Sequence, residues 1–431
     1  MIDPVVLHPT ALAIGGDAIA RIGGGDEAGT RRNGGPGANG KVVFIDGALP
    51  GETVEVRFDD EKTDYSKATT IAVSKAVPER VEPTCPHVAR GCGGCGWQFV
   101  DVLAQPTYKQ SMTVDALYRT GRIAAAKQLV TLAPPLPAGR HRTTVRAMIV
   151  NGQSAFREQG SNRGVIVDSC EVTHREVEHV LVNGRFGRAN EVTIRVGATT
   201  GDLLVVADPS ASGVRLPQPS PEWTAIGGRS VVVGLDAVGR GSGASYREVI
   251  DGVEFRVSAL SFFQTRPDGA EQLVSLLNTA LADHHDVLID LYGGVGLFAG
   301  TIGRRFQTVV SVEQEQSASD DAIVNLAHLD DANIVTEDVA EWRPSRSSTR
   351  GRNVAIIADP ARKGLGRGGV GAIARLEPGI VLLVSCDLGS LGRDAKLLGE
   401  AGFELESSMV VDLFPKTPHV EVVSRFVPRG N

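Results

Sequence analysis

The sequence predicts an α/β protein whose C-terminal part is a doubly wound, mainly parallel sheet. A small β-barrel is expected before it at the N-terminus, with a mostly β segment between the two. Three observations lead to this prediction. After residue 268, apolar strand-like runs alternate with helix-compatible stretches. Short runs of alternating apolar residues precede residue 80, and valine-rich runs broken by turn residues occupy residues 130–258.

Length and composition limit the classes of protein that fit. A chain of 431 residues suggests two or three domains. With 42% hydrophobic and 22% charged residues, it resembles a globular protein rather than a disordered one. Its net charge of −7 argues against a protein that coats nucleic acid non-specifically. The sequence shows neither a bilayer-spanning apolar run nor a secretory signal, so we expect a cytoplasmic location and no membrane partner.

The N-terminal segment has the pattern of short strands. Its alternating apolar residues, on either side of the turn-forming residues 48–53, are Val42, Phe44, Val54 and Val56. A glycine-rich stretch between Ile22 and Lys41 is expected to form a loop between two strands of the small barrel.

The C-terminal part begins with a predicted helix at residues 268–285 and an apolar strand that runs into the glycine-rich segment Asp290–Gly300. Glycines there let a ligand approach the backbone and the helix N-terminus that follows. Glu313 ends the next strand-like run, where a carboxylate commonly binds a ribose hydroxyl pair. The pattern is shorter than a dinucleotide fingerprint, so it favours S-adenosylmethionine over NAD. An ordinary strand–turn–helix with a capping acid is the alternative.

Three reactive side chains are predicted at neighbouring strand ends. Cys386 and Asp359 each follow an apolar run, and Glu421 lies within one. A lone cysteine in a sheet is more often a packing residue. A carboxylate in apolar surroundings, however, is costly unless it is paired or used. The three groups together therefore favour a reactive site over a purely structural core.

Over nearly its whole length, the chain resembles the S-adenosylmethionine-dependent RNA uracil-5-methyltransferases. The segments similar to successive motifs of that family are SFFQ (261–264), DLYGGVG (290–296), DPARKG (359–364), VSCD (384–387) and FPKTPHVE (414–421). ALPGETVEV (48–56) is similar to part of the TRAM domain, a small OB-like RNA-binding β-barrel. The resemblance implies a Rossmann-like methyltransferase domain with a doubly wound mixed sheet. We expect domains at 1–80 (TRAM-like), 81–262 (central, with the cysteines) and 263–431 (methyltransferase).

The resemblance also implies the roles of individual residues. Cys386 matches the nucleophile and Glu421 the general base. The positions that hold the methyl donor or the base beside it are matched by Gln264, Tyr292, Glu313 and Asp359. Uracil C5 is a poor nucleophile, but addition of a thiolate at C6 turns the ring into an enolate that attacks a methyl sulfonium. A base must then remove the C5 proton, and the target uridine must first leave its stack.

Three positions depart from the family motifs. Ala361 and Leu388 stand where proline is usual, and Asp387 stands where asparagine is usual. Loss of proline frees two turns, and an ionised Asp387 is expected to disfavour the thiolate beside it. We expect changes in geometry and rate rather than in reaction type. A catalytically impaired RNA-binding homologue is the alternative.

Four of the five cysteines suggest a metal centre. Cys85, Cys92 and Cys95 form a C-x6-C-x2-C pattern, with Cys170 as the candidate fourth thiolate. The spacing suits zinc and an iron–sulfur cluster equally. The resemblance implies a [4Fe–4S] cluster, although the first gap is one residue longer than usual in the family, and zinc is the less favoured alternative. His87 is expected to be a loop residue rather than a ligand.

Together, these features predict an enzyme that forms 5-methyluridine in RNA. The TRAM-plus-cluster arrangement resembles the rRNA branch of the family, which favours 23S rRNA over a tRNA T-loop. The candidates for an RNA path are Arg140, Arg142 and Arg146, with a solvated strand face as the alternative. An iron–sulfur redox protein fits less well, because it leaves Glu421 and Gln264 without a role. No obligate protein partner is evident.

Overall fold

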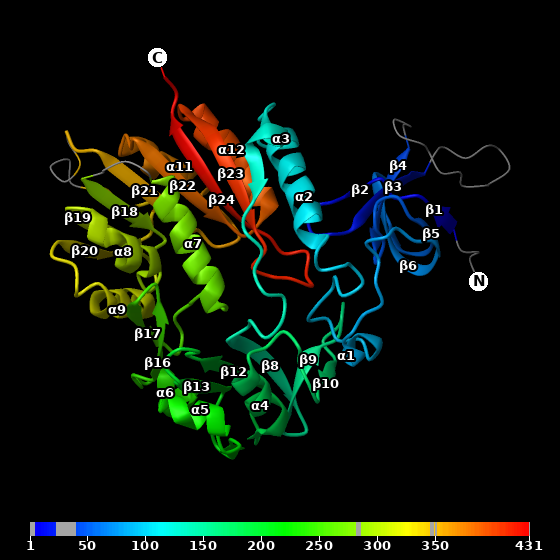
Figure 1. The fold of residues 1–431 in the computed structure, drawn as a ribbon, viewed down its shortest axis with the longest axis horizontal. Coiled ribbons are helices and arrows are strands. Elements are labelled where there is room, and N and C mark those ends of the chain that lie inside the picture. The colour runs from blue at the N-terminus through cyan, green and yellow to red at the C-terminus, as the bar shows by residue number, and fades with distance from the viewer. Residues whose placement is uncertain (1–4, 23–39, 282–285, 345–348, 350, 431) are drawn as a thin grey trace.

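The computed structural model describes residues 5–22, 40–281, 286–344, 349 and 351–430. The chain runs from an N-terminal sheet through a central sheet to a C-terminal α/β part (Figure 1). Most of the glycine-rich stretch that was expected to be a loop, residues 23–39, lies outside the described residues. The last residues of the helix predicted at 268–285 also lie outside them.

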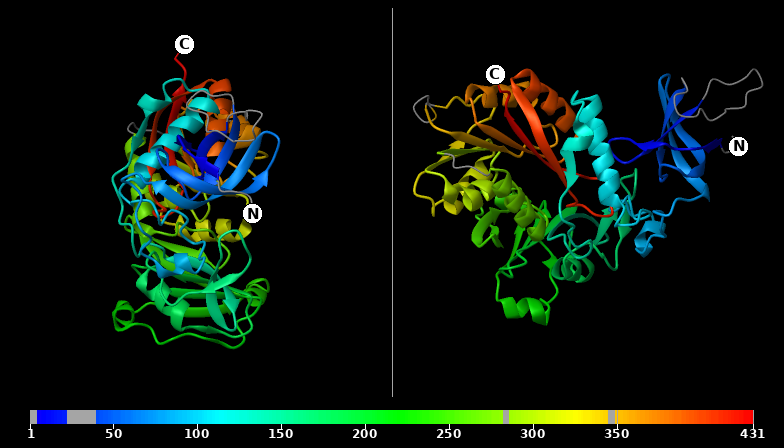
Figure 2. Two further views of the ribbon diagram at one scale, coloured as in Figure 1. Left: turned by 90° about the vertical axis from the view of Figure 1, so that its right-hand side faces the viewer. Right: turned by 45° about the horizontal axis from the view of Figure 1, so that its top comes forward.

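The N-terminal part is a curled six-stranded sheet in the order β1-β5-β6-β4-β3-β2 (Figure 1). Its strands are β1 (Val5–Leu7), β2 (Ala11–Leu12), β3 (Ala18–Ile22), β4 (Lys41–Asp46), β5 (Thr53–Glu61) and β6 (Tyr65–Lys75). The predicted strands are confirmed, but β4 buries Val43 and Ile45 rather than Val42 and Phe44. The reason is that its run of four apolar residues offers two apolar faces. The hairpin of β2 and β3 extends from this sheet toward helix α2 (Gln105–Arg119), as Figure 2 shows.

The central part contains a second six-stranded sheet in the order β10-β9-β8-β12-β13-β15, antiparallel except for its β13–β15 pair. Its strands are β8 (Thr144–Val150), β9 (Gln153–Arg157), β10 (Gly164–Ile166), β12 (Glu191–Val196), β13 (Leu203–Asp208) and β15 (Ser230–Gly234). The smaller elements are α1 (Pro86–Ala89), β11 (Arg185–Phe186), β14 (Val214–Arg215), α5 (Pro221–Ile226) and α6 (Leu235–Val238). Helix α4 (Arg175–Asn183) covers the sheet with Val177, Val180 and Leu181, which are buried against its apolar residues.

The C-terminal part is built on an eight-stranded mixed sheet in the order β20-β19-β18-β21-β22-β24-β23-β7. Its strands are β7 (Val130–Leu132), β18 (Val287–Leu291), β19 (Thr308–Glu313), β20 (Ala332–Thr336), β21 (Val354–Ala358), β22 (Ile380–Ser385), β23 (Phe403–Val411) and β24 (Glu421–Pro428). The five strands from β20 to β22 are parallel, and β24 is antiparallel to both of its neighbours. The predicted doubly wound mixed sheet is therefore confirmed.

Helices cover both faces of this sheet (Figure 1). One face packs against α7 (Pro267–Ala280), α8 (Leu297–Ile302) and α9 (Gln316–Asn325), and the other against α2, α11 (Gly366–Arg375) and α12 (Leu388–Glu400). Two short helices complete this part, α3 (Ala126–Leu129) and the 3-10 helix η1 (Gly303–Arg305). Because both faces are covered, strands such as β18 are buried at every position, which explains their unbroken apolar runs. Among the described helices, none has the length and apolar character needed to cross a bilayer.

Two segments of the expected central domain, residues 105–132 and 245–258, pack with the C-terminal part instead. Helix α2 lies against α12, and β7 extends the sheet at its edge beside β23. The hairpin of β16 (Ser245–Ile250) and β17 (Val253–Ser258) packs on α9, where Arg256 Nη1 lies 2.7 Å from Asp321 Oδ1. The pattern of apolar residues identifies an element but not the body it packs against. The expected boundaries of the central domain, at residues 81 and 262, therefore stay a prediction.

Candidate active site

The candidate catalytic residues lie at one edge of the C-terminal sheet. Parallel strands β18, β19, β21 and β22 end there, and antiparallel β24 begins there. In the sheet, β18 lies between β19 and β21. The chain adds β19 and β20 on one side of β18, and then adds β21 and β22 on the other side. In open α/β sheets, ligands bind in the crevice at such a point of reversal.

Cys386 and Glu421 are neighbours across two strands at this edge. Ser385, the last residue of β22, pairs with Val422 of β24 in antiparallel register. Cys386 and Glu421 are the next residues outward on each strand, so they lie opposite each other about one strand spacing, roughly 5 Å, apart. Glu421 is buried and Cys386 is half-buried. The structure therefore brings the thiol and the carboxyl group to one place.

Asp359 follows β21 and adds a second carboxyl group beside this pair. Burial, and then the charge of Asp359, raises the pKa of Glu421 well above its ordinary value. Burial also raises the pKa of Asp359 to about 7. The pKa of the Cys386 thiol rises to about 12, first through burial and then through Glu421 and Asp359, while Arg362 lowers it. In the free protein, the thiol is thus protonated at neutral pH.

A glycine turn after β18 forms the neighbouring crevice. Gly294 N donates to Glu313 Oε2 at 3.0 Å, which ties the turn to the end of β19. A Cβ atom at Gly293 would lie 2.3 Å from Ser311 Oγ, so this close approach needs glycine. Tyr292 has a φ of +60°, a left-handed conformation that is strained for a non-glycine residue. Tyr292 and Glu313, two of the predicted donor-binding residues, therefore flank one turn.

Asp290 is a residue of this crevice that the sequence analysis did not assign. It is fully buried in β18, and its Oδ2 accepts a hydrogen bond from Ala299 N at 3.0 Å. Its Oδ1 and the nearby Ser311 Oγ are buried and have no hydrogen-bond partner among the described residues. Burial, helped by Asp359 and Glu313, raises the pKa of Asp290 to about 7. Unpartnered polar atoms beside a glycine turn fit a polar ligand such as S-adenosylmethionine.

Gln264, unlike the other predicted donor-binding residues, does not lie at a strand end of the C-terminal sheet. It is on the loop between β17 and α7. Among the described residues, no hydrogen bond joins its side chain to the carboxylates of the site. The loop itself is fixed near the same sheet edge, because Arg266 Nη1 donates to Leu413 O at 3.3 Å, just beyond β23. A role for Gln264 stays a prediction.

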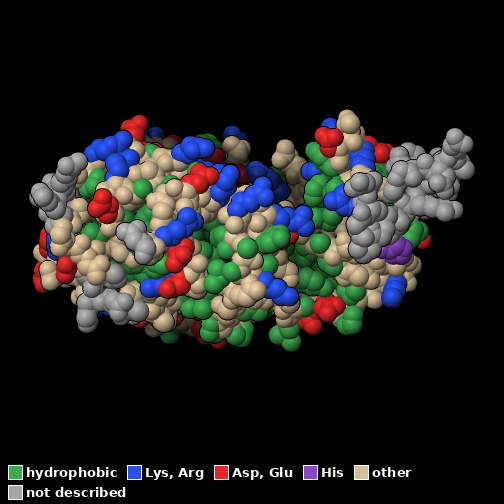
Figure 3. Space-filling model, turned by 90° about the horizontal axis from the view of Figure 1, so that it is seen from above, with side chains coloured by type: hydrophobic (Ala, Val, Ile, Leu, Met, Phe, Trp, Pro, Cys, Tyr) green, Lys and Arg blue, Asp and Glu red, His purple; other side chains and the backbone are tan. Residues whose placement is uncertain are grey.

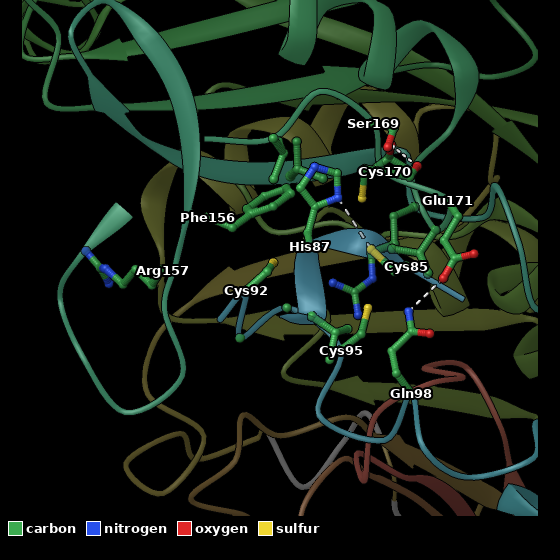
Figure 4. Close-up of a pocket in the computed structure, with 18 of the residues that line it drawn as sticks. Cys85, His87, Cys92, Cys95, Gln98, Phe156, Arg157, Ser169, Cys170 and Glu171 are labelled. Carbon is green, nitrogen blue, oxygen red and sulfur yellow. Dashed lines mark hydrogen bonds between the residues drawn. The ribbon is translucent and has the colours of Figure 1, made fainter. Parts of the chain in front are cut away.

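The structure also brings together the four candidate metal-binding cysteines. Cys85, Cys92, Cys95 and Cys170 line one cavity of about 340 Å³ (Figure 4). Burial raises the pKa of Cys92, of Cys95 (to about 11) and of Cys170, and the neighbouring thiols raise the pKa of Cys92 and Cys95 further. Within the described ranges, no three His, Cys, Asp or Glu side chains form a group suited to a single metal ion.

Two other residues at this cavity differ from expectation. His87 is buried on α1 rather than lying in a loop, and its Nδ1 lies 3.5 Å from Cys85 Sγ (Figure 4). Arg142 lines the cavity, and its buried Nε has no hydrogen-bond partner in the described structure. Its charge lowers the pKa of Cys95 and of Cys170. An unpartnered cation beside four thiols fits an anionic group in the cavity. The other two arginines proposed for an RNA path, Arg140 and Arg146, pair with Glu178 and Glu191.

Comparison with known proteins agrees with this geometry. Residues 10–71 match the family model of the TRAM domain. An uncharacterized RNA methyltransferase of Gloeobacter violaceus is 30% identical, over 97% of this chain and 95% of that protein. The 23S rRNA (uracil(1939)-C(5))-methyltransferase of Shewanella amazonensis is also 30% identical, over 90% of this chain and 91% of that enzyme. The chain belongs to the S-adenosylmethionine-dependent RNA uracil-C5 methyltransferases.

A solved structure supports the fold of this methyltransferase. The tRNA (uracil-54, C5)-methyltransferase of Pyrococcus abyssi, in complex with S-adenosyl-L-homocysteine, superposes with a TM-score of 0.65 at 21% identity. The match covers 90% of this chain and 97% of the archaeal chain. The likeness therefore extends across all three parts of the fold.

The departures of this methyltransferase from its family motifs have local explanations. Asp387 is the N-cap of α12, and its Oδ1 accepts a hydrogen bond from Ser390 N at 2.7 Å. Leu388 is buried as the first residue of that helix, and the turn at Ala361 is closed by a 2.7 Å hydrogen bond from Gly364 N to Ala361 O. The cap and this turn hydrogen bond therefore hold the backbone where proline is usual. Asp387 faces its own helix, and the carboxyl groups that chiefly raise the pKa of Cys386 are Glu421 and Asp359.

Proposed function

We propose that this methyltransferase forms 5-methyluridine in 23S rRNA, with Cys386 as the nucleophile and Glu421 as the general base. The observation that carries the proposal is the opposition of a thiol and a buried carboxyl group on adjacent strands, beside a glycine-lined crevice. The choice of 23S rRNA rests on the Shewanella relative, whose name gives that substrate. A tRNA T-loop uridine is the second candidate, since the Pyrococcus protein of similar fold acts on tRNA.

The first step forms the bond between Cys386 Sγ and C6 of the uracil. The thiol proton leaves as the bond forms, and Asp359 suits its acceptor because a pKa of about 7 leaves this carboxyl partly ionised at neutral pH. Negative charge moves into the ring as an enolate. The exposed Arg362 lowers the pKa of the thiol and so assists this step.

The second step transfers the methyl group from the sulfonium of S-adenosylmethionine to C5, and S-adenosylhomocysteine leaves. Glu421 then removes the C5 proton and the Sγ–C6 bond breaks. The departing thiolate regains its proton from Asp359, and Glu421 releases the C5 proton to water. A raised pKa makes the Glu421 carboxylate a stronger base than an ordinary one. In this proposal, Tyr292 and Glu313 bind the donor at the glycine turn, with Glu313 on its ribose, and Gln264 lies beside the reacting base.

The substrate must reach this edge and leave its stack. A net charge of −7 requires that positive charge be concentrated locally if RNA is to bind. Figure 3 shows Lys and Arg side chains gathered on the face seen from above, beside the junction with the N-terminal sheet. We propose that the TRAM domain and this face hold the folded RNA, while the target uridine is flipped into the crevice.

We also propose that Cys85, Cys92, Cys95 and Cys170 hold a [4Fe–4S] cluster. A cavity of about 340 Å³ is larger than one tetrahedral zinc ion fills, and the Arg142 charge suits an anionic cluster. Bound there, the group would cross-link two distant segments, and methyl transfer itself needs no electron. Anaerobically purified protein should contain iron and absorb at about 400 nm. Stoichiometric zinc without iron would contradict the assignment.

The test of function uses labelled S-adenosylmethionine with purified 23S rRNA and tRNA as separate substrates. We expect label on one uridine of 23S rRNA, and no label with the Cys386→Ala variant. Label on the tRNA T-loop alone would favour the second candidate. Label on a cytidine would contradict the proposal. Label on neither RNA with iron-loaded protein would also contradict it and would favour a catalytically impaired RNA-binding protein.

A further inference from the structure

The segment that leads to Glu421 is held by parts of the chain outside the methyltransferase sheet. Residues 412–420, here called the Glu421 loop, connect β23 to β24, and Glu421 is the first residue after the loop. Lys109 of α2, which is fully buried, donates from Nζ to Asp412 Oδ1 at 2.6 Å and to Phe414 O at 3.0 Å. The middle of the loop contacts the N-terminal sheet and the cysteine-bearing segments.

Lys416 of the Glu421 loop contacts Glu171, a residue that lines the cysteine cavity. Its side chain is only 17% exposed, and Nζ lies 2.6 Å from Glu171 Oε1. Glu171 follows Cys170 directly and lines the cavity. The same carboxylate accepts a hydrogen bond at 2.7 Å from Nε2 of Gln98, which lies three residues after Cys95 (Figure 4). Glu171 thus joins both cysteine-bearing segments to the Glu421 loop.

The backbone of Lys416 is fixed by two more contacts. Trp97 N donates to Lys416 O at 2.9 Å, which is a second link to the segment of Cys95. Lys416 N donates at 2.6 Å to Oε1 of Gln105, a fully buried side chain. Lys416 has a φ of +65°, a conformation that a side chain other than glycine rarely keeps without such restraints. The loop conformation therefore depends on its partners.

The N-terminal sheet contacts the loop two residues further on. Gly16, in the hairpin of β2 and β3, is so close to Pro418 that a Cβ atom at residue 16 would lie 2.4 Å from Pro418 Cβ. The same Cβ would lie 2.8 Å from Trp97 Nε1. The hairpin, the cysteine segment and the Glu421 loop thus meet in direct contact.

We propose that Lys416 is a positioning residue for methyl transfer, which couples the cysteine cavity to Glu421 through its ion pair with Glu171. The proposal rests on the proposed role of Glu421 as general base. Any change that releases Cys170 or Cys95 also releases a partner of the Glu421 loop. The carboxylate then loses its alignment with the C5 proton, and a misplacement of about 1 Å is enough to slow a reaction step strongly.

The test compares Lys416→Met with Lys416→Arg and Glu171→Gln, in the full-length, anaerobically purified protein. Lys396→Met is the matched control, because Lys396 pairs with Glu400 on an exposed helix face. For Lys416→Met we expect kcat to fall about tenfold or more, with the KM for S-adenosylmethionine nearly unchanged. A covalent complex with ordinary uridine RNA should accumulate, since the C5 proton leaves slowly. Lys416→Arg should restore much of kcat.

Hydrogen exchange gives a readout that does not depend on activity. Amides of the Glu421 loop should exchange about tenfold faster or more in Lys416→Met and in Glu171→Gln, with the absorbance of the metal centre retained. Wild-type exchange together with wild-type kcat in both variants would overturn the proposal, as would an effect on KM alone. If Lys416→Met does not fold, Glu171→Gln decides the matter. Failure of the wild-type protein to methylate RNA would instead count against the proposed function.

Discussion

Cys386, directly after β22, and Glu421, the first residue of β24, are each one residue beyond the pair that Ser385 makes with Val422. The relationship comes from an antiparallel strand inserted at the end of an otherwise parallel run, because such a strand begins where its neighbour ends. It places the thiol of Cys386, at the end of one strand, beside the carboxyl group of Glu421, at the start of the next, in a buried setting. Burial and proximity raise the pKa of both groups. The Cys386 thiol is therefore uncharged in the free protein at neutral pH.

Replacement of the carboxyl group tests its role as a base. In Glu421→Gln we expect kcat to fall by about 10²–10⁴-fold, because the C5 proton then has no acceptor. The methylated adduct should persist as a covalent protein–RNA complex, visible on a denaturing gel. Glu404→Gln, an exposed change on β23, is the control and should behave like the wild type. A Glu421→Gln enzyme that turns over normally would exclude this residue as the base.

The reactivity of Cys386 should increase steadily with pH. Its pKa is raised from 9.0 to about 12, so the thiolate fraction grows throughout the range from pH 7 to 10. Arg362 stabilises the thiolate, and Arg362→Gln should therefore slow alkylation by iodoacetamide by roughly twofold to fivefold at each pH. The rate should be followed for the Cys386 peptide by mass spectrometry. Arg367→Gln, an exposed change on α11, should have no effect, and equal rates in both variants would contradict the assignment.

Asp290 should make the stability of the free protein depend on pH. Its folded pKa is raised from 3.8 to about 7, so the unfolded chain ionises first as the pH rises. The free energy of unfolding should fall by a few kcal/mol, roughly between pH 4 and 7. Asp290→Asn should lose part of this fall, because Asp359 and Glu421 also have raised pKa values and keep their share of it, and should bind S-adenosylmethionine more weakly. Urea unfolding at pH 5 and 8 measures the effect, with the exposed Asp330→Asn as control. The same pH dependence in Asp290→Asn would contradict this origin.

Replacement of Asp387 should change the stability of the protein through helix α12 rather than the reactivity of the Cys386 thiol. Asp387→Ala removes the N-cap of α12 and should lower the free energy of unfolding by about 1 kcal/mol. Asp387→Asn keeps a capping oxygen, so stability should change by less than about 0.5 kcal/mol, with Cys386 alkylation unchanged. Several-fold faster alkylation of Asp387→Asn would instead support the sequence-based expectation that this carboxylate disfavours the thiolate.

Much of the fold was predictable because its signals are local. The apolar runs at β18, β19, β21 and β22 identify buried parallel strands, and Glu421 stands out as a carboxylate among apolar residues. Asp290 carries the same signal, since it interrupts an apolar run, but its place at the start of a glycine-rich motif masks that signal. The three-residue strand β7 is too short to give a periodic pattern.

The contacts between distant segments were not predictable from the pattern. Lys416 has the charge of an exposed residue, and its burial depends on Glu171, which lies far away in the sequence. His87 sits in a four-residue helix, too short for apolar periodicity, and is buried by its neighbours at the cysteine cavity. The opposition of Cys386 and Glu421 depends on strand order and register, which only the folded sheet fixes.

The most direct test of the account uses 23S rRNA that carries 5-fluorouridine. A base can remove a proton from C5 but cannot remove fluorine. A working enzyme should therefore stay covalently bound to the RNA after methyl transfer. We expect a covalent adduct that contains the transferred methyl group, mapped by mass spectrometry to the peptide of Cys386 and missing in Cys386→Ala. An adduct that persists in Cys386→Ala, or the lack of any adduct with protein that methylates ordinary RNA, would contradict the central claim.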